Sequence, residues 1–198
     1  MSDFQFYEES HIYTLAGKKL PCVSELCRFL KREVYKDAPT WRMKEAAARG
    51  TAIHAATQSL DASGSAPVDE ECAPYVRAYA RFLQEHTAVW ELTEHSLYHP
   101  TELYAGTIDR YGLLDGRRTL LDIKSTYKLE KPLCAASLNL YRKMLEAKGY
   151  TVERLAILHL KKNGTYKISY FPADDQLPRA LLVLNNVLKP KERKKRHV

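Results

Sequence analysis

Apolar residues recur with two different periods along the chain, and the period changes about half-way. In the first part they recur every three to four residues, as on the buried face of a helix. We therefore expect a small hairpin over residues 4–16, followed by helices over 23–35, 40–60 and 69–86. Pro39 and Thr40 open the long second helix, and the turn-rich segment DASGSAP ends it.

Beyond that point apolar and polar residues alternate, which is the period of half-buried strands. Strands are expected over residues 89–98, 103–113, 117–125, 152–160 and 165–171, with helices over 132–148 and 176–188. Trp41 and Trp90 are expected to anchor the hydrophobic core. The order of elements predicts one α/β (α+β) domain in which helices flank a mixed central β-sheet.

The composition is that of an ordinary soluble globular protein. Of the 198 residues, 45% are hydrophobic and 28% are charged, which excludes a disordered chain, a collagen-like repeat and a disulfide-rich miniprotein. No stretch approaches the roughly 20 apolar residues of a membrane span, so no membrane partner is expected. The opening MSDFQFYEES is acidic and polar, unlike a signal peptide, and predicts a cytoplasmic protein.

Positive charge is concentrated at the C-terminal end. The net charge is +7, and residues 189–198, KPKERKKRHV, carry six Lys or Arg against one Glu. This basic tail predicts contact with a polyanion such as nucleic acid. The alternative is a solvated chain end that binds nothing.

The chain has four cysteines, Cys22, Cys27, Cys72 and Cys134. They form no CxxC pair and lack histidines at zinc-ligand spacing, so zinc-ribbon and thioredoxin-type motifs are absent from the sequence. An iron–sulfur cluster would need four thiolates at one site, whereas these four fall in three different predicted helices or at their edges. We expect reduced, mostly buried thiols and no iron–sulfur cluster.

A tight turn sets the pairing of two predicted strands. Asp115 and Gly116 are residue types favoured in a two-residue type I′ turn, where both central residues have positive φ. With these two as the loop, opposed residues have numbers that sum to 231, so Asp109 lies opposite Asp122. The Cβ atoms of opposed residues are roughly 4.5–5.5 Å apart, and two carboxylates there repel by about 3 kcal/mol at an effective dielectric near 20. Such a pair indicates a function rather than a contribution to stability.

Lys124 joins the two carboxylates on one face of this hairpin. Side chains alternate along a strand, so Asp122 and Lys124 project together while Leu121 and Ile123 face the core. Two close carboxylates suit a hard cation such as Mg²⁺ or Mn²⁺, and a neighbouring ammonium can orient a water or neutralise a phosphate. The alternative is an ordinary exposed pair of Asp122 and Lys124, with Asp109 as a turn residue.

These residues are part of a series that resembles the PD-(D/E)XK nuclease superfamily, in particular its RecB-type exonuclease branch, from about residue 7 to residue 188. An opening HIY and LPCVS, at residues 11–13 and 20–24, is similar to that of stand-alone, often phage-borne members. The other motifs, in the family's order, are Arg49-Gly50-Thr51-Ala52-Ile53-His54 for R-G-x-x-x-H, Glu94 for the acidic residue before the hairpin, Gly106-Thr107-Ile108-Asp109-Arg110 for G-x-(I/V)-D-R, Leu121-Asp122-Ile123-Lys124-Ser125-Thr126 for (D/E)-x-K, and Tyr141 for the tyrosine of Q-x-x-x-Y.

The resemblance implies a restriction-endonuclease-like core and a single nuclease domain over residues 1–188, followed by the basic tail at 189–198. It implies a Mg²⁺- or Mn²⁺-dependent deoxyribonuclease, with an exonuclease expected, that acts on single- or double-stranded DNA in recombination, repair or phage DNA processing. A second copy of the chain or a phage recombination protein is a further expected partner. The rival interpretation is a weak or inactive nucleic-acid-binding module on a nuclease fold.

The resemblance also implies roles for individual side chains. The implied catalytic residues are Asp109, Asp122 and Lys124. The implied metal ligands are Asp109, Asp122, the Ile123 backbone carbonyl, His54 and Glu94. The implied substrate contacts are Arg49, Ser125, Ser137 and Tyr141.

Several of these assignments have a purely structural alternative. His54 could be an ordinary helix residue, with Gly50 on the same face leaving room for close approach to the sheet. A strand offset of one residue would turn Glu94 to the wrong face. Tyr141 could be a core aromatic residue. Ser137 stands where the family has glutamine, and its short hydroxyl cannot reach as far.

Overall fold

The structure is a computed structural model that describes residues 3–36 and 38–188. The basic tail over 189–198 lies outside the described residues, so its contact with a polyanion stays a prediction. None of the described helices is long and apolar enough to cross a membrane.

Five strands form the central sheet. In spatial order they are β4 (Ala88–Tyr98), β5 (Ala105–Leu114), β6 (Arg117–Lys124), β7 (Arg154–Leu160) and β8 (Tyr166–Phe171). Neighbouring strands are antiparallel except β6 and β7, which run parallel and are connected through helix α5 (Lys131–Ala147). The predicted mixed sheet is confirmed, with strand ends that differ from the expected ones by at most two residues.

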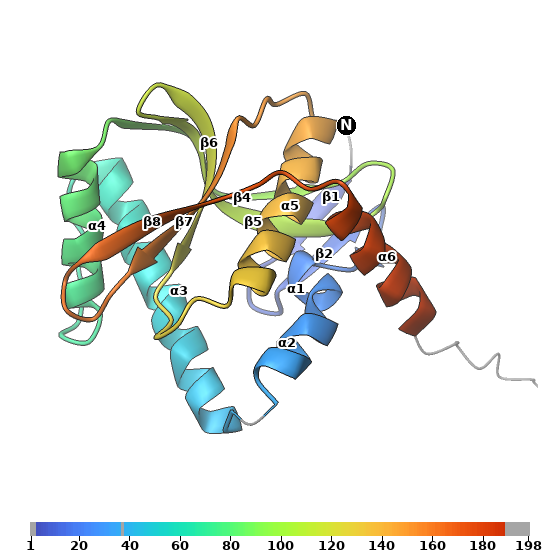
Figure 1. Ribbon diagram of the computed structural model, residues 1–198, viewed down its shortest axis with the longest axis horizontal. Helices are drawn as coiled ribbons and strands as arrows, with labels where there is room; N and C mark the ends of the chain where they lie inside the picture. Colours follow the sequence, from blue (N-terminus) through green and yellow to red (C-terminus); the bar gives the residue numbers. More distant parts are fainter. Residues whose placement is uncertain (1–2, 37, 189–198) are drawn as a thin grey trace, which may run out of the picture.

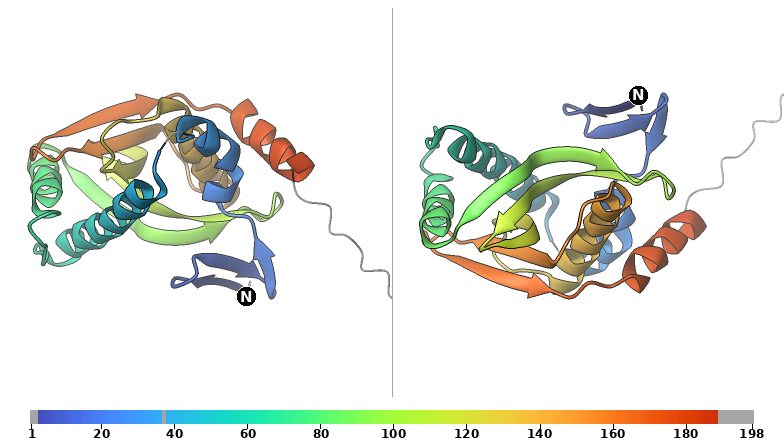
Figure 2. Two further views of the ribbon diagram at one scale, coloured as in Figure 1. Left: turned by 90° about the horizontal axis from the view of Figure 1, so that it is seen from below. Right: turned by 90° about the horizontal axis from the view of Figure 1, so that it is seen from above.

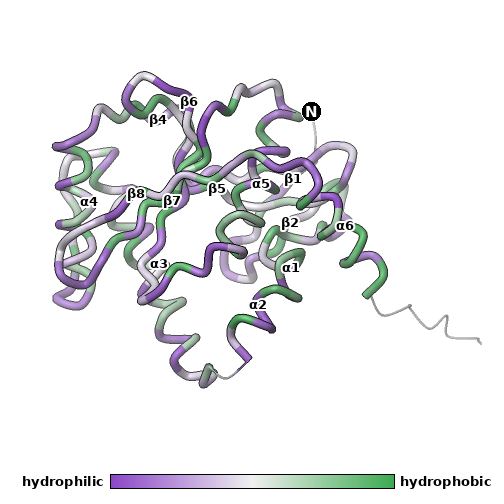
Figure 3. The backbone as a smooth tube through the Cα atoms, in the orientation of Figure 1, coloured by the Kyte–Doolittle hydropathy of each residue, from purple (hydrophilic) through white to green (hydrophobic). Residues whose placement is uncertain are grey.

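Helices cover both faces of this sheet (Figure 1). The helices α3 (Thr40–Ser63) and α4 (Ala73–Glu85) pack on one face, where Phe82 of α4 belongs to the same core cluster as Leu121. The helices α1 (Val23–Leu26), α5 and α6 (Gln176–Leu188) pack on the other face, where Met144 of α5 shares a cluster with Leu120. Consecutive residues of β6 therefore enter two different core layers, as the period of two requires. β7 lies between both layers, and its middle residues, Leu155 to Leu158, are apolar and buried (Figure 3).

A small second sheet lies beside the ends of β4 and β5 (Figure 2). It consists of β1 (Phe4–Tyr7), β2 (Ile12–Leu15) and β3 (Lys18–Leu20), paired in that order. The hairpin over residues 4–16 is confirmed, but β3 was not expected. The turn between β2 and β3 is formed by Ala16 and Gly17, which both have positive φ, at 49° and 72°.

The helix predicted over residues 23–35 is divided in two. α1 ends at Leu26, and α2 (Arg28–Val34) begins after Cys27, whose φ and ψ of −81° and 2° are not helical. The division places Cys27 in the core with no exposed surface. All four cysteines are buried and free, as predicted.

The expectation that Trp41 anchors the core is wrong. Its side chain is 58% exposed, because the first turns of α3 extend beyond the sheet (Figure 1). Trp90 is only partly buried, and it packs against the core layer that α3 and α4 cover.

Gly112 allows β4 to shift its pairing with β5 by one residue between Trp90 and Leu92. A Cβ at Gly112 would collide with the Val89 carbonyl and lie 2.8 Å from the Trp90 Cα, and neither backbone atom can yield cheaply. We expect Gly112→Ala to lower the free energy of unfolding by about 3 kcal/mol, the upper range of overpacking costs. Urea denaturation measures this difference.

Gly50→Ala is the matched control, because a Cβ at Gly50 would meet no atom within 4 Å. In a helix this substitution should stabilise the protein by about 0.5–1 kcal/mol. If the two substitutions change the free energy of unfolding equally, Gly112 is not what allows the pairing of β4 with β5 to shift. The expectation that Gly50 allows close packing on the sheet is wrong, because no atom lies within 4 Å of the position that its Cβ would take.

Candidate metal centre

The Asp115-Gly116 turn has the predicted geometry. Both residues have positive φ, at 49° and 74°, and the pairing of β5 with β6 follows the predicted register from the turn as far as Arg110 opposite Leu121. The next pair in this register is Asp109 and Asp122, and here the regular ladder ends. The carboxylates therefore lie at the point where the two strands part.

The Asp109 carboxylate occupies the gap between β5 and β6. Its Oδ2 accepts a hydrogen bond from the backbone N–H of Ile123 at 2.6 Å, in place of a strand–strand bond. The amide and carbonyl of an extended residue point to the same side of its strand, so the Ile123 carbonyl faces the same gap. Asp109 is only 8% exposed.

Glu94 brings a third carboxylate to the same place. The pairs on either side of it in β4 place Glu94 opposite Asp109, after the shift that Gly112 allows. Its φ is 44°, which is uncommon for a residue with a side chain. The expected alternative, in which an offset turns Glu94 away, is thus excluded by the irregular backbone. Three neighbouring strands each contribute one carboxylate, Glu94, Asp109 and Asp122.

His54 of α3 completes this group from above the sheet. Its Nδ1 lies 3.1 Å from Oε1 of Glu94 and 3.6 Å from Oδ1 of Asp109. Burial lowers the pKa of His54, but the charges of Asp109 and Glu94 outweigh this effect and raise the pKa to about 9. The ligand atoms of these three residues lie within 4.8 Å of one another. His54 is therefore not an ordinary surface residue of its helix.

Asp122 and Lys124 form an ion pair on the adjacent strand, in which the carboxylate is buried and the lysine side chain is 33% exposed. Oδ2 of Asp122 is 2.5 Å from the Lys124 Nζ, and Asp122 is only 4% exposed, which excludes the alternative of an ordinary exposed pair. Burial lowers the pKa of Lys124, but the charges of Asp122 and Asp109 outweigh it and raise the pKa, so the ammonium form is stabilised. Oδ2 of Asp122 makes no hydrogen bond of good geometry to any described residue.

Arg110 connects the carboxylates to the core and was not predicted as a site residue. Its guanidinium is completely buried and donates hydrogen bonds to Asp61 Oδ2 at 2.7 Å, Glu94 Oε1 at 2.9 Å and Thr57 Oγ1 at 3.2 Å. The hydroxyl of Tyr79 donates to the same Asp61 carboxylate. Arg110 thus holds Glu94 in position. The sequence signal for a role of Arg110 was a charged residue within a mostly apolar strand. Its partners on α3, Asp61 and Thr57, lie 49 and 53 residues away in the sequence, so they could not be identified from it.

These side chains open into a cavity of about 840 Å³ between α3, the small sheet and the strand gap. Its walls include the five residues Asp109, Asp122, Glu94, His54 and Lys124. Further residues that line it include Tyr13, Ser24, Gly50, Thr51, Gln58, Thr107 and Tyr141. Since Gly50 has open space at its Cβ position, it widens the cavity beside His54.

Two of the four predicted substrate contacts are accounted for by other interactions. Arg49 forms an ion pair with Glu71 at 3.2 Å, and the Ser137 hydroxyl lies 3.9 Å from the Cys27 thiol. Neither residue lines the cavity, and neither does Ser125. Their roles as substrate contacts stay predictions that this geometry does not support.

Tyr141 does line the cavity, although it also packs against the core. A Cβ at Gly106 would lie 2.7 Å from Tyr141 Cε1, so this glycine leaves room for the ring. Burial, followed by the charges of Asp122 and Asp109, raises the pKa of the Tyr141 hydroxyl well above its ordinary value. The hydroxyl therefore remains a neutral donor close to the carboxylates.

The donor set fits a divalent cation. Carboxylates supply hard oxygen ligands, and Asp122 Oδ2 is a buried oxygen without a hydrogen bond of good geometry. Arg110 fixes the orientation of Glu94, and a cation would displace the proton that the carboxylates hold on His54. A possible metal-binding group of His54, Glu94 and Asp109 is thus present, with Asp122 beside it.

No family model matches the chain, and no curated protein matches it. Among solved structures, the fold is similar to that of an alkaline exonuclease, LHK-Exo, from Laribacter hongkongensis. The two chains are 11% identical, the match covers 84% of each, and the TM-score is 0.48. A likeness at this level carries no conclusion about activity.

Proposed function

We propose that the chain is a divalent-metal-dependent nuclease that hydrolyses phosphodiester bonds in DNA. The observation that carries this proposal is the convergence of three carboxylates, a histidine and a lysine on one cavity wall, at the point where β5 and β6 part. The order of motifs that resembles the PD-(D/E)XK superfamily supports the same reaction. We further infer an exonuclease of the RecB type, on the resemblance alone.

The metal would be held by Asp109, Asp122 and Glu94, with His54 and the Ile123 carbonyl as further ligands. When bound, Mg²⁺ or Mn²⁺ would activate a water molecule and offset the charge that develops on the phosphate. Without a cation the three carboxylates would repel a phosphate. A module that only binds nucleic acid has no need of three carboxylates that face its ligand, so this cluster favours a metal-dependent reaction over binding alone.

Lys124 supplies the positive charge that a reacting phosphate needs. Its ammonium is stabilised by Asp122, so it acts as a donor that orients a water or a phosphate oxygen. The neutral hydroxyl of Tyr141 is a second donor on the same wall. Preorganised donors of this kind stabilise charge that develops in a transition state, because they need no reorientation during the reaction.

Metal binding should raise the thermal stability of the protein. A cation that binds only the folded state at a hundredfold excess over its Kd adds about 2.7 kcal/mol, which corresponds to a rise in Tm of about 5–10 °C in a domain of this size. Thermal unfolding with Mg²⁺, with Mn²⁺ and with a chelator measures the shift. In Asp109→Asn the shift should vanish, although the amide oxygen can still accept the Ile123 hydrogen bond.

Asp115→Asn is the matched control, since it removes a carboxylate from the same hairpin but at the partly exposed turn. This variant should keep the full metal-induced shift. A parent protein whose Tm ignores both cations would contradict a metal site and would favour the nucleic-acid-binding module.

The exonuclease assignment is tested on DNA topology. With Mg²⁺ present, linear single- and double-stranded DNA should be degraded, while covalently closed circles of the same sequence should persist. Equal loss of circles and linear molecules would identify an endonuclease and leave the metal-dependent chemistry unchanged.

A further inference from the structure

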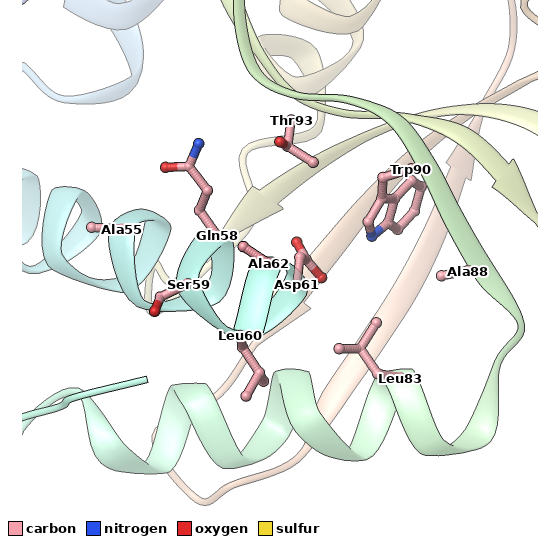
Figure 4. A pocket seen from close by; sticks show the side chains of 10 residues that line it. All are labelled: Ala55, Gln58, Ser59, Leu60, Asp61, Ala62, Leu83, Ala88, Trp90 and Thr93. Atoms are coloured by element: carbon pink, nitrogen blue, oxygen red, sulfur yellow. The ribbon is translucent and has the colours of Figure 1, made fainter. Parts of the chain in front are cut away.

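A second cavity lies next to the candidate metal centre (Figure 4). Its volume is about 780 Å³, within the range of ligand sites. It lies between α3, α4 and the first half of β4, and Ala55 and Gln58 of α3 line both cavities. The two cavities are therefore neighbours along one helix.

The walls of this second cavity combine apolar side chains and one aromatic ring with several polar groups, a mixture that suits a polar planar ligand. Leu60, Leu83 and Ala88 rest on the core layer beneath α3 and α4. Gln58 and Asp61 are the amide and carboxylate in the lining. The remaining lining residues are Ala55, Ser59, Ala62, Trp90 and Thr93.

Trp90 is part of this cavity and is more than the core anchor expected from the sequence. Its indole Nε1 is buried and has no hydrogen-bond partner among the described residues. Figure 4 shows this nitrogen on the side of the ring that faces Asp61. A buried donor without a partner is unfavourable, so a ligand that turns the ring enough to offer this N–H an acceptor would gain affinity.

Asp61 ties the second cavity to the metal centre. Its carboxylate accepts hydrogen bonds from Tyr79 at 2.9 Å and from Arg110 at 2.7 Å. The guanidinium of Arg110 also donates to Glu94 at 2.9 Å. The side chain of Arg110 thus connects Asp61 in the second cavity directly to Glu94, a candidate metal ligand.

We propose that the second cavity binds a nucleobase of the substrate strand, on a nucleotide next to the phosphodiester that is cleaved. The indole of Trp90 would stack on the base or donate its N–H to a base acceptor, and Gln58 would pair with the base edge. This inference rests on the proposed nuclease function. It adds to that function a site that reads the base rather than the phosphate.

The chemistry of the walls favours a base over the other parts of a nucleotide. The described lining contains no Lys or Arg that would bind a phosphate, whereas an aromatic ring beside apolar side chains suits a planar heterocycle. The indole N–H, the carboxylate and the Gln58 amide together offer donors and acceptors, which match the mixed edge of a base. A purely aliphatic ligand would leave these groups unpaired.

The chain has two tryptophans, which makes the test selective. In Trp41→Phe, Trp90 is the sole indole, and in Trp90→Phe the exposed Trp41 is the sole indole. Both proteins carry Lys124→Ala so that DNA stays intact in the presence of Mg²⁺. The probes are oligothymidylate and an oligomer of abasic residues of the same length. Indole emission reports on the cavity, and anisotropy of labelled oligomers reports on overall binding.

We expect oligothymidylate to bind about tenfold or more tightly than the abasic oligomer and to quench the emission of Trp90 but not of Trp41. Trp90→Phe, which can stack but has no N–H to donate, should keep only part of the preference for the base, and Trp90→Leu should lose it at an unchanged Tm. If both oligomers bind equally and leave Trp90 emission unaltered, the base site is overturned while the nuclease proposal stands. If neither oligomer binds, the proposed function itself fails, and this inference fails with it.

Discussion

Lys124→Ala should lower the rate of DNA cleavage by at least about a hundredfold, which is the usual cost of removing a catalytic proton donor or a transition-state donor. Among the described residues that line the cavity Lys124 is the only lysine, and its Nζ lies 2.5 Å from Asp122. Initial rates at saturating DNA with Mg²⁺ measure the loss. Burial raises the pKa of Asp122, so its carboxyl can take up a proton when Lys124 is absent and the protein should still fold.

Lys19→Ala is the matched control for this rate. Lys19 forms an ion pair with Glu25 at 3.0 Å on the small sheet, where it is well exposed, and it does not line the cavity. Its removal should leave the rate within about twofold of the parent, in keeping with the small energies of surface pairs. A Lys124→Ala protein that degrades DNA at the parent rate would refute the mechanism.

Arg110→Met should lower the free energy of unfolding by about 3–5 kcal/mol, because it leaves two acidic side chains without their common partner in a buried place. The guanidinium has no exposed surface and bridges Asp61 and Glu94. Arg110→Lys should recover only part of this loss, since a point charge cannot bridge two carboxylates as a planar fork does. Urea denaturation of the metal-free protein gives each value.

Arg81→Met removes an arginine whose hydrogen-bonded ion pair with Glu85 is exposed, and it serves as the comparison. It should change the free energy of unfolding by less than about 1 kcal/mol. If Arg110→Met falls in the same range, the guanidinium does not hold Glu94 in place. In that case the irregular backbone at Glu94 would be its main constraint.

Local chemistry made much of the fold predictable. Every strand of the central sheet was predicted to within two residues at each end, from alternating or continuous apolar runs of strand length between turn residues. The Asp115-Gly116 turn predicted the register of β5 and β6, since its positive φ values allow only one pairing. The prediction was wrong where the pattern of apolar residues does not tell which other elements pack against a side chain. Trp41 is apolar, but it lies in the first turn of α3, where its side chain is 58% exposed among the described residues.

The sequence by itself determined the carboxylate hairpin of this protein, with Asp109, Asp122 and Lys124 on one wall, because residues within about fifteen positions are related by a single turn. Only the tertiary structure decided what completes the site. The approach of His54 to Glu94 and the burial of Arg110 against Asp61 join segments 40 and 49 residues apart, and no local period encodes such contacts. The cavity beside Trp90 also exists only once α3, α4 and β4 are packed, because its walls come from all three.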